Sequence, residues 1–305
     1  MKRVVSLLPA ATEIVAGLGL TEWLVGVSHE CDYPPDVSSK PRVTHCEIHN
    51  CGLPSEAIDR WVRETLKSNG TLYTMDEPLL RDLAPDVIIT QRLCDVCAVG
   101  YGSVTALAAT LPGPPQVVNL EPSSLEDIYG DIRRVAAALD EPGRGDQLVS
   151  SLNERVEIIR KQTQRIEQRP RCFLMEWIDP PFCSGHWGPE LVEIAGGYDP
   201  LGNRGSDSTR ILWESVVEAQ PQIIVLACCG YTVERTLQDV PILRGLPGWA
   251  DLPAVRDSKV YAVDGSAYFS RPGPRVVDSL EILAEIIHPS YFAGAYPERG
   301  VVRVV

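Results

Sequence analysis

The sequence has no long hydrophobic run and no excess of positive charge. No stretch of 18 apolar residues occurs, so we expect no segment that spans a bilayer. Lys and Arg number 28 against 41 Asp and Glu, which gives a formal net charge of −13 at pH 7. Phosphate backbones and anionic membrane surfaces are bound by clustered cations, so this composition argues against nucleic acid and anionic membrane surfaces as partners.

Common enzyme motifs are also missing. The sequence contains no Gly-rich phosphate-binding loop, no Gly-x-Ser-x-Gly elbow and no His-Glu-x-x-His motif. A nucleophilic pair of Cys183 with His186 stays open as an alternative. Lying three residues apart on one loop, however, these two side chains more naturally share a ligand. We therefore expect a non-enzymatic protein.

The chain is long enough for two domains with separate cores. It has 305 residues, of which 44% are hydrophobic and 23% charged. Short β-rich runs alternate with amphipathic helical stretches in both halves, which predicts an α/β fold with mainly parallel sheets. The predicted strands are 4–8, 24–27, 87–90 and 116–119 in the first half, and 172–176, 223–227 and 259–263 in the second.

A long helical stretch lies between the two halves. Apolar residues recur at spacings of three, four or seven over residues 143–168, which places them in one stripe on a helix, and Pro170 ends the pattern. We expect a rigid connector between two Rossmann-like lobes, although a peripheral helix of one large domain is the alternative. The predicted division is an N-terminal lobe at 1–142, a linking helix at 143–169 and a C-terminal lobe at 170–305.

The first residues and the cysteines bear on the compartment. Lys2 and Arg3 precede an apolar stretch, as in a short signal peptide, but Pro9 and Glu13 interrupt it and residues 4–8 fit a buried strand. Nine cysteines without an export signal fit thiols or metal ligands better than a disulfide framework. We therefore expect a cytoplasmic protein.

Ligands of open parallel sheets bind outside the carboxyl ends of the strands. Thiol and imidazole side chains, the ligands of zinc, iron and iron–sulfur clusters, follow several predicted strands. The alternative is that these cysteines pack in the core. Cys172 and one of the adjacent Cys228 and Cys229 are expected to do so, and His288 is expected at the surface. The metal-ligating candidates are His29, Cys31, Cys94, Cys97, Cys183, His186 and Cys229.

Aromatic side chains gather in the same predicted loops and suit a large, flat organic ligand. A further cluster, Cys46, His49 and Cys51, is either part of a zinc site or a solvated loop. Residues 301–305 are compatible with a short strand. The aromatic candidates are Tyr101, Trp177, Trp187, Tyr231, Tyr268 and Phe269.

Several segments carry a family resemblance. They include RVVSLLPAATE at 3–13 and SRPGPR at 270–275, together with residues 24–28, 32–35, 83–89, 179–185 and 196–197. The chain resembles the vitamin B12-binding proteins of bacterial ABC importers over about residues 3–287. The resemblance implies two α/β lobes joined by one long helix, with a cobalamin or a metal chelate bound in the cleft between them.

The resemblance also implies roles for individual residues. Tyr33, Trp187, Tyr268 and Phe269 match the aromatic positions at or near the corrin ring. The family docks on its permease through one carboxylate on each lobe, and Glu214 matches on the second lobe. On the first lobe the matching position is Pro78, with Glu77 beside it. This departure and the missing export signal argue against a permease partner and favour a cytoplasmic, cysteine-rich branch of the family.

The leading hypothesis is a protein that binds a cobalamin-type corrinoid. His29, His186 or a thiolate approaches the cobalt, and Arg92 and Arg271 meet polar substituents of the ligand. The alternative keeps the fold and replaces the corrin by zinc, iron, an iron–sulfur cluster or another metal chelate held by the Cys and His residues.

Overall fold

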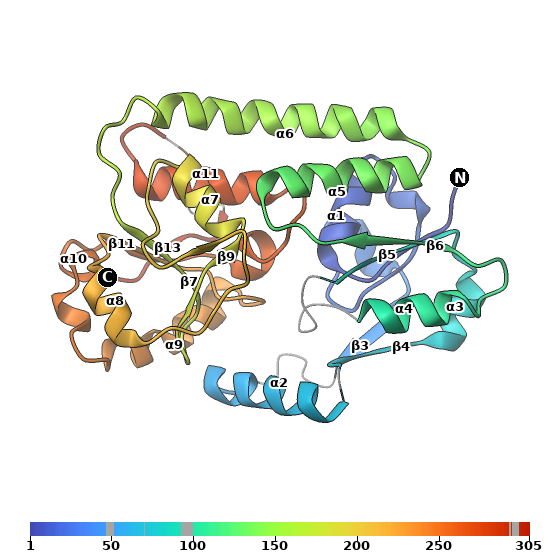
Figure 1. Cartoon of the computed structure of the whole chain (residues 1–305), viewed down its shortest axis with the longest axis horizontal. Coiled ribbons are helices and arrows are strands. Elements are labelled where there is room, and N and C mark those ends of the chain that lie inside the picture. Colours follow the sequence, from blue (N-terminus) through green and yellow to red (C-terminus); the bar gives the residue numbers. More distant parts are fainter. Residues whose placement is uncertain (47–51, 70, 93–99, 293, 295–298) are drawn as a thin grey trace. The chain divides into compact units, whose positions relative to one another are not determined.

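The computed structural model describes the chain except residues 47–51, 70, 93–99, 293 and 295–298 (Figure 1). It divides into two compact units. Unit 1 consists of Met1–Leu53, Ala57–Pro122 and Glu126–Ser151, and unit 2 consists of Pro54–Glu56, Ser123–Leu125 and Leu152–Val305.

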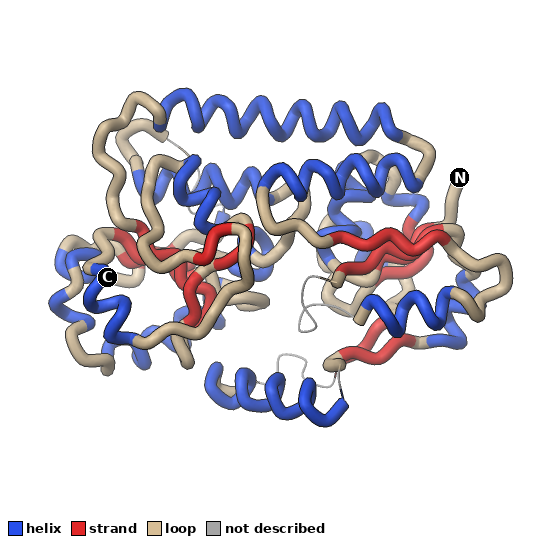
Figure 2. The backbone as a smooth tube through the Cα atoms, in the orientation of Figure 1, coloured by secondary structure: helices blue, strands red, loops and turns tan. Residues whose placement is uncertain are grey.

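Unit 1 is built on a parallel sheet of four strands in the order β2-β1-β5-β6 (Figure 2, red). Every residue of β1 and β5 is buried, as expected for central strands with both faces covered. The strands are β1 (Val4–Ser6), β2 (Leu24–Val27), β5 (Val87–Gln91) and β6 (Gln116–Leu120), and the helices around them are α1 (Pro9–Gly17), α3 (Glu77–Leu83), α4 (Tyr101–Ala108) and α5 (Leu125–Ala138).

Unit 1 also contains a two-stranded antiparallel pair that we did not predict. β3 (Thr44–Cys46) pairs with β4 (Tyr73–Met75), and α2 (Ser55–Asn69) lies between them in sequence. Each strand is only three residues long, so the alternation of side chains is too short to identify it.

Unit 2 is built on a five-stranded sheet in the order β13-β12-β11-β7-β8. The three central strands are parallel, and the two edge strands are antiparallel to their neighbours. The strands are β7 (Cys172–Trp177), β8 (Phe182–Cys183), β11 (Ile223–Leu226), β12 (Val260–Ala262) and β13 (Val302–Arg303), with a separate pair of β9 (Gly185–His186) and β10 (Asn203–Arg204), and the helices are α7 (Gly188–Ile194), α8 (Trp213–Ala219), α9 (Val233–Arg244), α10 (Pro253–Arg256) and α11 (Val276–Ile287).

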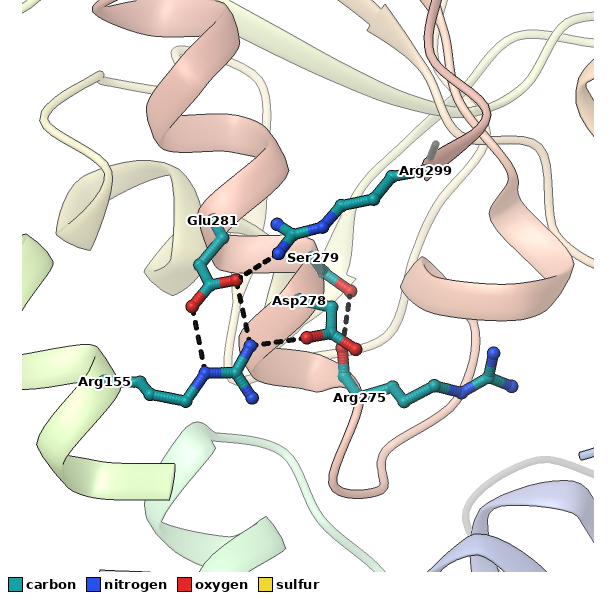
Figure 3. Close-up of polar contacts among 6 residues, drawn as sticks. All are labelled: Arg155, Arg275, Asp278, Ser279, Glu281 and Arg299. Carbon is teal, nitrogen blue, oxygen red and sulfur yellow. Dashed lines mark hydrogen bonds and ion pairs between the residues drawn. The ribbon is translucent and has the colours of Figure 1, made fainter. Parts of the chain in front are cut away.

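The predicted long helix is α6 (Pro142–Thr163), which ends before residue 168. Its residues from Leu152 onwards belong to unit 2. There Arg155 donates hydrogen bonds to Glu281 and Asp278 of α11, and Arg299 donates to the same Glu281 (Figure 3). A single network of charged groups thus connects α6, α11 and the C-terminal segment of unit 2.

The α/β fold with parallel sheets is confirmed, but one local expectation is wrong. His288 is not at the surface: it is 8% exposed, and its Nε2 lies 3.1 Å from the carbonyl oxygen of Gly196. Among the described residues, no helix is long and apolar enough to cross a membrane.

Candidate functional site

The carboxyl ends of β7 and β11 bring two predicted aromatic residues together in unit 2. Trp177 is the last residue of β7, and Tyr231 follows β11; their ring centroids lie 4.7 Å apart. The guanidinium of Arg235 lies 4.3 Å from the Tyr231 ring centroid and donates to its hydroxyl at 3.1 Å. The result is a pair of rings tilted by 46°, with a guanidinium over one of them that also pairs with Asp239 at 2.9 Å.

The adjacent cysteines after β11 differ in environment. Cys229 is exposed, whereas Cys228 is buried, and burial raises the pKa of the Cys228 thiol to about 12. This difference follows the alternation of side chains along an extended chain. Cys229 is the thiol that a ligand can reach at this strand end.

The loop after β7 carries His186 and two further predicted residues. The His186 backbone has φ +49, and its ring stacks on that of Trp187 at 5.7 Å. Burial lowers the pKa of His186, which favours the neutral imidazole that coordinates metals. Cys183 and Trp187 are buried, and the Cys183 sulfur lies 3.4 Å from the Thr209 hydroxyl oxygen.

Two buried carboxyls that we did not single out fix this loop. Glu176 of β7 accepts hydrogen bonds from the Gly185 N–H and the Ser208 hydroxyl. Burial raises its pKa to about 7. A Cβ on Gly185 would lie 2.3 Å from the Ser208 nitrogen, so only glycine permits this close approach. An acidic residue at the end of an apolar strand was the available sequence signal.

Asp199 anchors the same region from the other side. It accepts from the Ser184 hydroxyl and the Leu174 N–H, and also from two backbone N–H groups of its own loop. Burial raises the pKa of Asp199 to about 6. No hydrophobic pattern or ligand motif marks this residue in the sequence.

The remaining predicted ligand residues of unit 2 follow β12. Tyr268 is half-buried, with the Arg275 guanidinium 5.4 Å from its ring centroid. Phe269 and Arg271 are buried, and Arg271 donates to the Ser266 hydroxyl at 3.4 Å. Tyr268 therefore presents the most accessible surface of the three.

Three predicted residues of unit 1 follow β2. Tyr33 is exposed, and the His29 Nδ1 lies 2.8 Å from the Thr44 hydroxyl oxygen. Cys31 is buried and accepts a hydrogen bond from the Thr12 hydroxyl at 3.0 Å. Burial raises its pKa to about 11, which disfavours the thiolate form that binds metals. Of the two metal-ligand candidates, His29 is the more plausible donor.

The other candidates of unit 1 lie apart or fall outside the described residues. Arg92 is exposed, with Nε 3.9 Å from a carboxylate oxygen of Glu121, and Tyr101 is half-buried at the start of α4. Cys94, Cys97, His49 and Cys51 lie outside the described residues, whereas Cys46 ends β3. The described residues contain no group of three or more His, Cys, Asp and Glu side chains suited to a metal ion.

The two predicted docking carboxylates occupy similar local positions. Glu77 lies in the first turn of α3 in unit 1, and Glu214 lies in the first turn of α8 in unit 2. Both residues are exposed.

Comparison with known proteins gives consistent matches along the chain. The family model described as "Periplasmic binding protein" matches residues 4–267. A vitamin B12-binding protein of Vibrio cholerae is 24% identical over 92% of this chain and 87% of its own length. An uncharacterized ABC transporter substrate-binding lipoprotein of Bacillus subtilis is 24% identical over 95% of this chain and 81% of its length.

Solved structures share the fold. A periplasmic heme-binding protein from Roseiflexus, in its apo form, matches with a TM-score of 0.70 and 23% identity, covering 95% of this chain and 99% of that one. The periplasmic vitamin B12-binding protein of Vibrio cholerae matches with a TM-score of 0.67 and 22% identity, covering 95% and 97%.

These findings contradict the expectation of a cytoplasmic protein. The matched proteins are described as periplasmic binding proteins or as a lipoprotein, which are extracytoplasmic. The expectation rested on the first residues and on cysteine usage, and neither determines the compartment. Val4–Ser6 forms a core strand of the fold, so its apolar character says nothing about export. A separate cytoplasmic, cysteine-rich branch has no support either.

Proposed function

Because the chain belongs to the periplasmic binding protein family, we propose that it binds a cobalamin-type corrinoid and does not catalyse a reaction. The observation that carries this proposal is the Trp177–Tyr231 pair, with Arg235 beside it, at the carboxyl ends of β7 and β11. The relatives named as vitamin B12-binding proteins support it at the level of sequence.

The corrin ring needs apolar contacts, whereas its polar substituents need hydrogen-bond donors. The half-buried rings of Trp177 and Tyr268 offer apolar faces to the macrocycle, and exposed Tyr33 is the candidate in unit 1. Tyr231 is buried and supports Trp177. Arg92 is exposed and provides donors for the amide substituents of a corrinoid. Trp187, Phe269 and Arg271 are buried, so we assign them to the support of these contacts.

A haem-like metal chelate is the second candidate ligand. Two observations favour it: the half-buried His186 has a lowered pKa, and Cys229 is exposed, so both offer donors for an axial metal position. Solved structures with the same fold are named as heme-binding proteins. A protein-bound zinc, iron or iron–sulfur site through Cys94 and Cys97 remains the third reading; both residues lie outside the described ones.

Parallel titrations of the purified protein with aquocobalamin and with hemin test the proposal. We expect saturable binding of aquocobalamin near one per chain, with a dissociation constant at least tenfold below that for hemin. Trp177→Ala should weaken corrinoid binding by about tenfold or more, since a stacked aromatic contact of about 0.5–1.5 kcal/mol is lost together with buried area.

Trp23→Ala is the matched control. Trp23 is also half-buried, but it precedes β2 and so lies at the amino end of a strand. Its replacement should leave the affinity unchanged. Tighter binding of hemin than of aquocobalamin would favour a haem-like metal chelate. Binding of neither compound, with zinc or iron retained after purification, would favour a protein-bound metal or iron–sulfur site.

A further inference from the structure

Unit 1 carries a groove that the proposed ligand site does not use. It has a volume of about 680 Å³ and is bounded on one side by four consecutive residues of β6, Gln116 to Asn119. The other side is formed by α5 and includes Asp127, Asp131 and Arg134. The helix α5 runs beside β6 in Figure 1.

The groove follows the open edge of the sheet. β6 pairs with β5 on one side and is the terminal strand of its sheet among the described residues. Side chains of consecutive strand residues point to opposite faces, so a groove lined by four in succession lies along the strand edge. The Gln116 N–H donates to Asp86 on the β5 side.

In a parallel pair, alternate residues direct their backbone groups to the same neighbour. Val117 and Asn119 therefore direct theirs away from β5, toward the groove. The contact from Arg134 Nη1 to the Asn119 carbonyl oxygen, at 3.3 Å, agrees with this direction.

A buried carboxylate in the groove has an unused acceptor. The Asp131 side chain is 2% exposed, and its Oδ1 pairs with Arg134. Its Oδ2, and the Oδ1 of the Asn119 side chain, are buried and find no hydrogen-bond partner within the part of the chain that the structure describes. Buried acceptors of this kind call for a donor. Burial raises the pKa of Asp131 to about 7, although the adjacent Arg134 acts in the opposite direction.

We infer that this groove binds an extended peptide segment that carries a lysine or arginine and adds as a strand to the edge of β6. Backbone groups of Val117 and Asn119 pair with the peptide backbone, and the cationic side chain donates to Asp131. The lining contains four carboxylates, from Glu121, Glu126, Asp127 and Asp131, and one cation, Arg134. Arg92 and Arg133, outside the lining, lie 3.9 Å from Glu121 and 3.8 Å from Glu126, so the lining stays acidic chiefly at Asp127 and Asp131.

The acidic lining favours a basic peptide over a second copy of this chain. A second copy of the chain would bring the same acidic groove against itself, and the whole chain has a net charge of −13. A basic segment from another protein is complementary instead.

Fluorescence anisotropy with labelled heptapeptides tests the inference. We expect a peptide that alternates threonine with lysine to bind saturably at one per chain, and its counterpart with glutamate in place of lysine to bind at least tenfold more weakly. Methylation of alternate backbone nitrogens of the lysine peptide should also reduce affinity at least fivefold, because it blocks strand pairing while keeping the charge.

Two variants locate the contact. Asp131→Asn and Val117→Pro should each weaken binding of the lysine peptide at least fivefold, the second because proline removes an outward N–H while leaving the β5 pairing intact. Glu64→Gln, an equal charge change at an exposed position of α2, should change affinity less than twofold.

Three results overturn the inference. Equal affinity for the lysine and glutamate peptides would contradict recognition by charge. Full affinity of the methylated peptide would contradict strand addition. A dimer in sedimentation that Val117→Pro dissociates identifies a second copy of the chain as the occupant.

Discussion

Gly196 and His288 illustrate how a single residue without a side chain permits a long-range contact. Gly196 follows α7 with φ +88, in the left-handed region that favours glycine. A Cβ there would lie 2.7 Å from the His288 Nε2 and 3.0 Å from its Cδ2. The buried imidazole thus occupies the space that a side chain at position 196 would need.

Gly196→Ala should destabilise the protein. We expect the free energy of unfolding to fall by about 1–3 kcal/mol, because alanine is strained at this φ and its methyl group displaces the imidazole. Urea unfolding followed by circular dichroism measures the change. In the control Gly102→Ala, in α4, the new Cβ meets nothing within 4 Å, so stability should hold or rise slightly. Equal losses in the two variants would contradict this explanation.

At the scale of elements, charged side chains join α6 to α11. Burial alone would raise the pKa of Glu281, yet Arg155 and Arg299 hold it below its usual value. Arg155 uses two guanidinium nitrogens and two acidic partners, whereas Arg160 on the same helix pairs with Glu157 one turn away. The first arrangement connects two elements, and the second stays within one helix.

Arg155→Ala should therefore cost more stability than Arg160→Ala. The Arg155 side chain is 35% exposed, so solvent screening limits the expected loss to about 1–2 kcal/mol. Arg160→Ala should lose less than about 0.5 kcal/mol, as expected for an i,i+3 pair at the surface. Denaturant unfolding of the two variants, compared at equal m-values, measures the two losses in stability. Similar losses would show that the Arg155 network stabilises the protein no more than a surface ion pair does.

At the scale of the whole molecule, Glu77 in unit 1 and Glu214 in unit 2 are both exposed, and each lies in the first turn of a helix. Glu77 and Glu214 are the candidates for contact with an ABC permease, the partner that our sequence reasoning doubted. The relative from Bacillus subtilis is named as an ABC transporter substrate-binding lipoprotein, which supports such a partner. The family's docking carboxylate corresponds to Pro78 in this chain. Glu77 lies beside it in the same helical turn and carries a carboxylate, so the displacement by one residue is compatible with docking.

Charge reversal tests this docking role. We expect Glu77→Arg and Glu214→Arg each to reduce the stimulation of ATP hydrolysis by the reconstituted importer about tenfold, because each reverses the charge at a proposed docking position. The affinity for the ligand should stay within twofold of the original. Glu64→Arg, an equal change on α2, should leave the stimulation intact. Unchanged stimulation in both charge-reversal variants would place the docking surface elsewhere.

Local sequence patterns predicted much of the architecture. The strand Leu24–Val27 has the predicted bounds, and Val87–Gln91 begins at its predicted residue, because a run of apolar residues marks each segment. The segments around residues 3–13 and 270–275 also identified the family. Parallel strands are buried on both faces, so their apolar runs are visible without any knowledge of neighbours.

Contacts between distant residues were decided only by the tertiary structure. The β3–β4 pair, the burial of His288 against Gly196 and the anchoring roles of Glu176 and Asp199 all join segments that local patterns treat separately. The sequence placed Cys31 and Cys183 at strand ends, but their burial depends on the residues that pack around them. A chain specifies its elements through short-range preferences, whereas exposure, pKa and partners arise when distant segments share one core.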